Sequence, residues 1–124
     1  TGKMLGVHHY YDQSLIRLDG PGRFPAVPVG NPQELEQGEA VLMLGFPKLY
    51  YRQDRPPLLR LGRVVSWYTH QIMTSCRLEG GDSGGPLFNL KGELLGTNQL
   101  SGMKGAHGAV GLDQRQCRIV VGVE

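Results

Sequence analysis

Short apolar runs separated by turns rich in glycine and proline are the feature that most constrains how this chain can fold. About ten such runs follow one another at spacings of roughly ten residues. This rhythm predicts an all-β chain, built as an antiparallel barrel or sandwich. Helical periodicity is poor almost everywhere, and one helical turn is predicted in residues 31–38, with Pro32 near its start and Gly38 at its end. The expected strands cover residues 3–7, 14–18, 26–29, 40–46, 58–68, 70–75, 85–89, 92–99, 108–112 and 117–123.

The composition agrees with a turn-rich β protein that buries a core. The chain has 124 residues, including 19 glycines and 8 prolines without a fixed period, and 40% of its residues are apolar. This length suits one domain or part of a larger one, and the apolar share favours an ordered chain over a disordered one. The formal net charge is only +2, which is too small to imply a polyanionic partner.

Neither a membrane span nor a signal peptide is expected in these residues. No apolar stretch is long enough to cross a bilayer, and the first residues contain no basic segment followed by an apolar run. Because the sequence begins with Thr1 instead of methionine, we expect it to be a piece of a longer product. The two cysteines, Cys76 and Cys117, are expected to be buried thiols, with one disulfide between them as the alternative.

The segment LEGGDSGGPL, residues 78–87, places a single hydroxyl, that of Ser83, among four glycines. Glycine is costly in ordered structure, so several in a row call for a reason. One reading is a loop that only turns. The other is a nucleophile on a tight turn, in which Asp82 is turned away and the N–H groups of Gly81 and Ser83 converge on a developing oxyanion.

A hairpin is predicted directly after this turn. Residues 88–99 hold two apolar runs on either side of a short turn that contains Gly92. The second strand would run beside Ser83 and offer its backbone to an extended peptide, which is recognition by β-augmentation. The geometry therefore suits a peptide or protein substrate.

The heptapeptide GDSGGPL, followed by GELLGTNQ, resembles the nucleophile region of the trypsin-like serine peptidases, which have the two-barrel chymotrypsin fold. Upstream, YYDQSLIRLDG resembles the strand that the family's catalytic aspartate begins, so Asp12 would be the carboxylate that orients the general base. Residues 24–47 resemble the connection between the barrels in the bacterial HtrA (Deg) group. The resemblance covers nearly the whole chain and implies a serine endopeptidase that forms an acyl-enzyme at Ser83 without a cofactor.

The resemblance also implies how the chain is organised. Residues 1–30 would be the end of a first, incomplete β-barrel that carries the aspartate strand, and residues 31–124 would be the second barrel, with the nucleophile and the substrate pocket. The family implies peptide or protein substrates, and the HtrA-like group implies an extracytoplasmic location, either periplasmic or secreted. An oligomer, or association with a missing N-terminal segment, is a further expectation.

A general-base histidine is missing from the pattern. In the family it lies several strands before the aspartate, in a Thr/Ser-Ala-(Ala/Gly)-His stretch that this chain lacks. His8 and His9 would point to opposite faces of a strand, and we interpret them as surface or rim residues, while His70 and His107 have no motif. Truncation is the favoured explanation; the alternatives are a pseudo-enzyme that binds peptides without cleaving them and a histidine supplied by another chain. The chain alone is therefore expected to be a very poor enzyme.

The motif alignment also implies residues that contact the substrate. Arg77 would lie near the base of the primary pocket and favour an acidic side chain, and the alternative is an arginine turned to solvent or paired with Glu79. Residues 98–101 would pair with the substrate backbone, and Gly108 and Gly111 resemble the far wall of the pocket, where glycine leaves room. The candidates for substrate binding are Arg77, Asn98, Gln99, Leu100, Ser101 and Gly108.

The residue before the nucleophile leaves one question open. In the animal trypsin-like enzymes it pairs with a new N-terminal amine after zymogen cleavage, but no Ile-Val-Gly-Gly start is visible in this sequence. Asp82 is therefore expected to be held either by such an amine on a missing segment or by other hydrogen bonds.

Residues 48–63 form a basic stretch with interleaved tyrosines, of the kind that a nucleic-acid surface uses. Turn residues in its first half and the small net charge favour a solvated loop and strand face instead, so no nucleic-acid partner is expected. No metal site is expected either, because the histidines and cysteines lack ligand spacing. The cations of this stretch are Lys48, Arg52, Arg55, Arg60 and Arg63.

Overall fold

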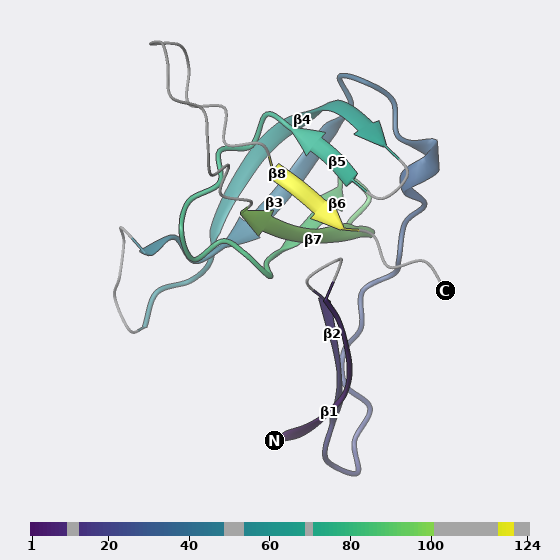
Figure 1. Ribbon diagram of the computed structural model, residues 1–124, viewed down its shortest axis with the longest axis vertical. Coiled ribbons are helices and arrows are strands. Elements are labelled where there is room, and N and C mark those ends of the chain that lie inside the picture. The colour runs from purple at the N-terminus through teal and green to yellow at the C-terminus, as the bar shows by residue number, and fades with distance from the viewer. Residues whose placement is uncertain (10–12, 49–53, 69–70, 101–116, 121–124) are drawn as a thin grey trace.

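The computed structural model is all-β in the residues that it describes, as the sequence predicts. Two sheets are present there: a two-stranded sheet near the N-terminus and a closed barrel made by the rest of the strands (Figure 1). The described residues are 1–9, 13–48, 54–68, 71–100 and 117–120.

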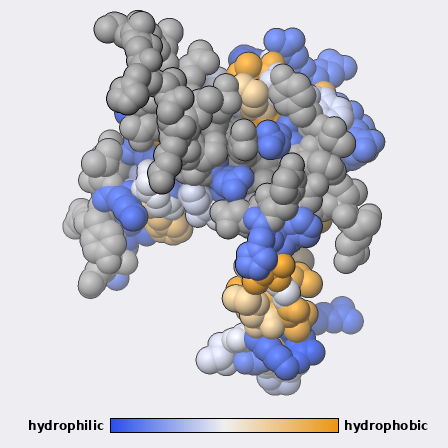
Figure 2. Space-filling model, viewed as in Figure 1, coloured by the Kyte–Doolittle hydropathy of each residue, from blue (hydrophilic) through white to orange (hydrophobic). Residues whose placement is uncertain are grey.

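The two-stranded sheet consists of β1 (Gly2–His8) and β2 (Gln13–Leu18), which pair antiparallel. It forms the lower projection in Figures 1 and 2, where hydrophobic atoms show on its surface. The expectation that residues 1–30 belong to a first barrel stays a prediction. The large apolar side chains that this sheet exposes are Met4, Leu5, Val7, Leu15, Ile16 and Leu18.

Six strands close into the barrel, and each pairs antiparallel with its two neighbours. Their order around the barrel is β3-β4-β5-β8-β7-β6, so the sixth strand in the circle pairs back with the first. Closure gives every strand a partner on both sides, although β7 extends beyond Thr97, its last residue paired with β6. The strands are β3 (Ala40–Gly45), β4 (Leu58–Tyr68), β5 (Gln71–Thr74), β6 (Pro86–Asn89), β7 (Leu94–Leu100) and β8 (Cys117–Val120).

The hydrophobic core fills the barrel. Alternate residues of β3, β5 and β6 are buried, which is the period of strands with one face on a core. Cys76 belongs to this core as a free thiol. Burial raises the pKa of the Cys76 thiol, and a hydrogen bond with Thr74 and the charge of Arg60 oppose this only in part. The core side chains are Leu35, Val41, Met43, Val64, Ile72, Cys76, Leu78, Leu87 and Leu95.

The expected strand at residues 26–29 is wrong. Only an isolated bridge, from Val29 to Leu94, joins this segment to the barrel. Pro28 has no N–H and accepts a hydrogen bond from the Leu94 N–H without donating one, so a ladder cannot continue through it. The expected strand at residues 108–112 lies outside the described residues.

Two other local expectations are confirmed. The predicted helical turn is a short 3-10 helix at Pro32–Glu34, and the side chain of its N-cap residue, Asn31, accepts a hydrogen bond from the Gln33 N–H. The predicted hairpin is formed by β6 and β7, and Gly92 in its turn has a φ of 80°. This hairpin carries the chain away from the turn of residues 79–85 that holds Ser83, called the serine turn below, and brings it back alongside that turn.

Candidate active site

Ser83 lies on two consecutive tight turns that lead from the barrel core into β6. The N–H of Asp82 donates to the carbonyl oxygen of Glu79 at 3.0 Å, and the N–H of Gly85 donates to the carbonyl oxygen of Asp82 at 3.0 Å. Ser83 is exposed, whereas its neighbour Asp82 is fully buried. The chain thus exposes the hydroxyl-bearing residue and turns the carboxylate inward, which agrees with the orientation expected for Asp82.

The end of β3 lies directly under this turn. A Cβ built on Gly81 would overlap the carbonyl oxygen of Phe46, and a Cβ built on Gly85 would overlap that of Leu44. Gly81 also has a φ of 103°, in the left-handed region that favours glycine. These two glycines are therefore needed because one backbone segment approaches another too closely for any side chain.

The segment under the turn is itself held in place. The N–H of Lys48 donates to the carbonyl oxygen of Gly80 at 2.7 Å. The Arg55 guanidinium donates to the carbonyl oxygen of Pro47 at 2.8 Å and lies 5.5 Å from the centre of the Phe46 ring. Arg55 therefore holds in place the residues Phe46 and Pro47, which lie against the start of the serine turn.

The N–H groups of the turn differ in what they bind. The N–H of Gly84 donates to the carbonyl oxygen of Asn98 at 2.8 Å, so it is engaged within the chain. The N–H of Gly81 donates to no other residue in the described part of the chain. Gly81 lies two residues before Ser83, and backbone N–H groups close to a nucleophile are the kind of donor that stabilises an oxyanion during acyl transfer.

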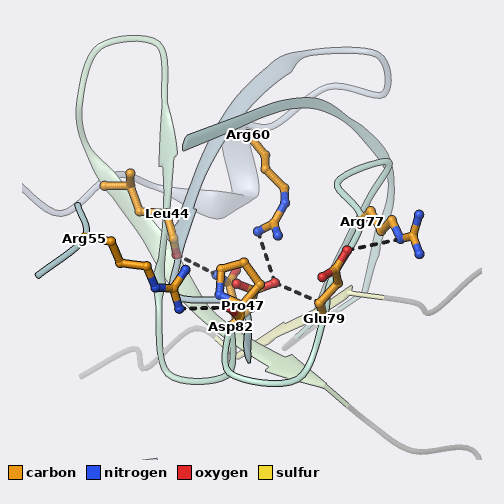
Figure 3. Close-up of polar contacts among 8 residues, drawn as sticks. Leu44, Pro47, Arg55, Arg60, Arg77, Glu79 and Asp82 are labelled. Carbon is orange, nitrogen blue, oxygen red and sulfur yellow. Dashed lines mark hydrogen bonds and ion pairs between the residues drawn. The ribbon is translucent and has the colours of Figure 1, made fainter. Parts of the chain in front are cut away.

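Asp82 is held by a buried ion pair (Figure 3). Its Oδ2 lies 3.0 Å from Nη1 of Arg60 and accepts a hydrogen bond from the N–H of Glu79 at 2.8 Å. The Asp82 side chain is 0% exposed and that of Arg60 only 15%. Its Oδ1 lies against Gly45 of β3, where a Cβ would overlap it. Asp82 was expected to be held either by an amine on a missing segment or by other hydrogen bonds. The contacts that hold it in the structure come from within the chain.

Arg77 is exposed and paired with Glu79, which is the alternative to a place at the base of the substrate pocket. Its side chain is 75% exposed, and its Nε lies 3.5 Å from a carboxylate oxygen of Glu79. Figure 3 shows the Arg77 guanidinium turned away from Asp82. A role for Arg77 in recognising an acidic substrate side chain stays a prediction.

Asn98 ties β7 to the serine turn. Its N–H donates to the carbonyl oxygen of Gly85 at 2.7 Å, its own carbonyl oxygen accepts from Gly84, and its Nδ2 donates to the carbonyl oxygen of Leu44 at 3.3 Å. These contacts favour a supporting role for Asn98, whose backbone N–H is already used within the chain. Of the other expected substrate contacts, Gln99 and Leu100 lie on β7, and Ser101, Gly108 and Gly111 lie outside the described residues.

A cleft of about 580 Å³ lies between the two-stranded sheet and the serine turn. Gly84 and Thr97 line it from the barrel, and His8, Gln13 and Ser14 are among the residues that line it from β1 and β2. Asp12, the expected orienting carboxylate, lies outside the described residues, as do His70 and His107. Gln13, the residue after Asp12, reaches the cleft.

His8 is exposed, as expected for a surface or rim residue, and it also borders the cleft. It ends β1 opposite Gln13 and lines the same cleft as Gly84. His9 is exposed. His8 is the last residue of β1 and His9 follows it in a turn, so the expected alternation of the two histidines along one strand does not apply.

Three arginines of the basic stretch have contacts within the chain. Arg55 contacts Pro47, Arg60 contacts Asp82, and Arg63 donates to the carbonyl oxygen of Gly38 at 2.8 Å. These contacts favour structural roles over a nucleic-acid surface. In the described part of the chain, no group of acidic, histidine and cysteine side chains could hold a metal ion. No helix among those residues is long and apolar enough to cross a membrane.

Sequence reasoning missed Arg60 as a partner of Asp82. The signal was present in the alternation of β4, where Arg60 falls on the same face as Gly62 and Val64, both of which are buried. A charged residue in the inward register of a strand requires a buried partner. Which carboxylate supplies that partner depends on the packing of segments far apart in the chain.

Comparison with known proteins gives consistent results. Residues 1–96 match the family described as trypsin-like peptidase domain. The chain is 36% identical over 99 residues to a protein of Ectopseudomonas mendocina (strain ymp) named probable periplasmic serine endoprotease DegP-like, covering 77% of this chain and 21% of that protein. A protein of the same name from Hahella chejuensis (strain KCTC 2396) is 32% identical over 101 residues, covering 79% of this chain and 21% of that protein. The chain thus spans about a fifth of the length of the curated relatives that it matches.

Proposed function

The chain belongs to the family of trypsin-like peptidase domains, and from this premise we propose that it forms the nucleophile-bearing part of a serine endopeptidase. One observation carries the proposal. The turn fixed on the end of β3 exposes Ser83 and leaves the Gly81 N–H without an acceptor among the described residues, while Asp82 between them is turned inward. A hydroxyl next to a preorganised N–H donor is what acyl transfer requires.

In this proposal Ser83 Oγ attacks the carbonyl carbon of the scissile peptide bond. A general base takes the hydroxyl proton, and the N–H groups of Gly81 and Ser83 stabilise the oxyanion of the tetrahedral intermediate. When the intermediate collapses, the C–N bond breaks, the base returns the proton to the leaving amine, and the acyl group stays on Ser83. Water then hydrolyses the ester by the same steps and regenerates the hydroxyl.

The base is the part of the machinery that this sequence does not identify. We propose that Asp12 orients a histidine supplied from outside these residues, either from an upstream segment or from another chain. His8 is the candidate within the chain, because it lines the cleft beside Gly84. Each source predicts a different effect of replacing His8.

The proposed substrates are peptides and proteins. Gln99 and Leu100 of β7, followed by Ser101, are proposed to pair with the substrate backbone, and Gly108 to line the pocket for a substrate side chain. The relatives named above are described as periplasmic, and we propose an extracytoplasmic location for this protein as well. Assembly into an oligomer belongs to the same proposal.

The proposal is tested by hydrolysis of a chemically unfolded protein by the complete natural polypeptide that contains this chain. Ser83→Ala is expected to lower hydrolysis by at least about 10³-fold, because the nucleophile is lost. His8→Ala is expected to leave hydrolysis within about threefold if the base comes from elsewhere, and to lower it as much as Ser83→Ala if His8 is the base. Hydrolysis that does not depend on Ser83 would contradict the proposal.

A peptide-binding pseudo-peptidase is the second candidate, because β7 runs beside the serine turn, where an extended peptide could bind without being cleaved. It predicts a folded protein that binds an extended peptide and does not cleave it. Replacing Ser83 by alanine would then leave the dissociation constant of the peptide unchanged, as measured by isothermal titration calorimetry. Peptide cleavage that is lost in Ser83→Ala excludes this candidate.

A further inference from the structure

We propose that Lys48 is a specificity-determining residue: its ammonium group forms a subsite beside the serine turn that favours an acidic side chain directly after the scissile bond. This inference rests on the function proposed for Ser83 and names a class of substrate for that site. It gives a role to a side chain of the basic stretch that forms no ion pair with the described residues.

The first step is the position of the lysine side chain. The N–H of Lys48 donates to the carbonyl oxygen of Gly80 at 2.7 Å, which holds the lysine backbone against the serine turn. A Cβ built on Gly81 would lie 3.3 Å from Cγ of Lys48, and one built on Gly80 would lie 3.9 Å from its Cδ. The aliphatic stem of Lys48 therefore runs along the part of the turn that carries the proposed oxyanion donor of Gly81.

The second step is that the carboxylates of the serine turn do not neutralise this charge. Lys48 is exposed, and its ammonium group has no counter-ion in the part of the chain that the structure describes. The Asp82 carboxylate is buried against Arg60 (Figure 3). The Glu79 carboxylate is mostly buried and has Arg77 beside it. An ammonium group without a counter-ion attracts an acidic side chain that a substrate brings next to it.

The third step places Lys48 relative to the substrate. β7 contacts residues 84–85, at the end of the serine turn, whereas Lys48 contacts residues 80–81, at its start. An extended peptide that pairs with β7 and crosses Ser83 therefore continues past residues 80–81 toward Lys48. In this proposal the half that pairs with β7 is the acyl half, because that half must stay bound until water releases it from Ser83. The half that leaves as the amine is then the one that meets Lys48.

A lysine at this place gives a modest preference. Its ammonium group is a hydrated point charge on a flexible stem, without the rigid fork that lets arginine bind a carboxylate through two hydrogen bonds. Ion pairs that are open to water contribute little, and salt screens them. We therefore expect a peptide with glutamate after the scissile bond to have a kcat/KM about fourfold higher than the same peptide with glutamine, and the preference to shrink at about 1 M salt.

The experiment digests a chemically unfolded protein mixture with the complete natural polypeptide and identifies the cleavage sites by mass spectrometry. Aspartate and glutamate are expected to be enriched about threefold at one of the two positions that follow the scissile bond. Quenched fluorescent peptides that carry glutamate or glutamine at that position then give the ratio of kcat/KM for the acidic and the neutral substrate. Cleavage sites without this enrichment, or a ratio near one, would overturn the inference.

Three replacements of Lys48 test whether its charge causes the preference. Lys48→Gln keeps most of the stem and removes the charge, so the ratio is expected to fall from about four to about one. Lys48→Arg keeps the cation and is expected to retain the preference. Lys48→Glu is expected to invert it, so that glutamine is cleaved faster than glutamate. An unchanged ratio in Lys48→Gln would overturn the inference.

Lys91→Gln is the matched control. Lys91 is also exposed, and it lies in the hairpin turn between β6 and β7, away from Ser83. The replacement changes the net charge of the chain by the same amount as Lys48→Gln, and it is expected to keep the ratio of the wild type. Equal losses of the preference in the two variants would show an effect of net charge without a subsite, and would contradict the inference.

The proposed function and the acidic subsite fail separately. If hydrolysis depends on Ser83 and shows no preference for acidic residues, only the subsite fails. If no hydrolysis depends on Ser83, the proposed function fails, and peptide binding decides the subsite. A peptide mixture is then passed over the immobilised wild type and over Lys48→Gln, and the bound peptides are identified by mass spectrometry. About threefold greater retention of acidic peptides by the wild type supports the subsite, and equal retention overturns it.

Discussion

Two close contacts with β3 determine the conformation of the turn around Ser83. Gly85 lies so close to the carbonyl oxygen of Leu44 that a Cβ would overlap it, and Gly45 leaves the space that the Asp82 carboxylate occupies. Both contacts join the turn to the end of β3. The conformation of the turn is therefore imposed by the barrel wall, and a flexible loop of the same composition would not have it.

Replacing Gly81 by alanine is expected to damage the site more than the fold. The new Cβ meets the carbonyl oxygen of Phe46 in a backbone conformation with a φ of 103°, so the peptide unit that carries the donor must move. Cleavage that depends on Ser83 is expected to fall by about 10²-fold, as for the loss of one oxyanion donor. The kcat for a peptide substrate is the measurement.

Gly92→Ala is the matched control for this change. Gly92 has a similar φ of 80°, no atom lies near its missing Cβ, and it sits in the hairpin turn away from Ser83. It is expected to lower the free energy of unfolding by about 1 kcal/mol and to leave kcat unchanged. Equal losses of kcat in Gly81→Ala and Gly92→Ala would contradict the role given to Gly81.

At the residue level, the sequence predicts turns that neighbouring residues build. The hydroxyl of Ser83 and the glycines beside it are adjacent in the chain, so their shared turn could be predicted from one heptapeptide. The Arg60–Asp82 pair could not, because it joins β4 to a distant turn. The same limit applies to Arg77, for which the sequence offered a pocket or a contact with Glu79 and could not choose between them.

At the level of elements, alternating and continuous apolar runs predicted the strands well. The expected strand at residues 26–29 failed because Pro28 cannot donate to a ladder. The order in which β5, β8 and β7 become neighbours was not predictable, since it depends on pairings between strands far apart in the sequence. The turn chemistry around Gly92 predicted the β6–β7 hairpin because that pairing is local.

The two sheets are expected to differ in local stability. Every residue of β1 is exposed, and a lone two-stranded sheet is marginal in water, whereas β3 and β6 contribute buried residues to the core. Hydrogen–deuterium exchange of this chain, followed by mass spectrometry, is expected to be at least about tenfold faster in β1 and β2 than in β3 and β6. Equal protection of the two sheets would show that the small sheet is stabilised by contacts not described above.

At the level of the whole molecule, residues from both sheets and from the serine turn line one cleft. Gly84 borders it from the barrel, and His8 and Gln13 border it from the small sheet. Asp12, which is proposed to orient the general base, directly precedes Gln13 in the chain, and its own position lies outside the described residues. The chain spans about a fifth of its curated relatives, so the complete protein is the proper object of an activity measurement.

The most direct test of the central claim is the reaction of Ser83 with a fluorophosphonate, which forms a stable bond to an activated serine. The complete natural protein is incubated with the reagent, and peptide mapping by mass spectrometry locates the adduct. We expect one adduct per chain, on Ser83, and none after Ser83→Ala. A folded protein that carries no adduct on Ser83, or that is labelled equally after Ser83→Ala, would contradict the account.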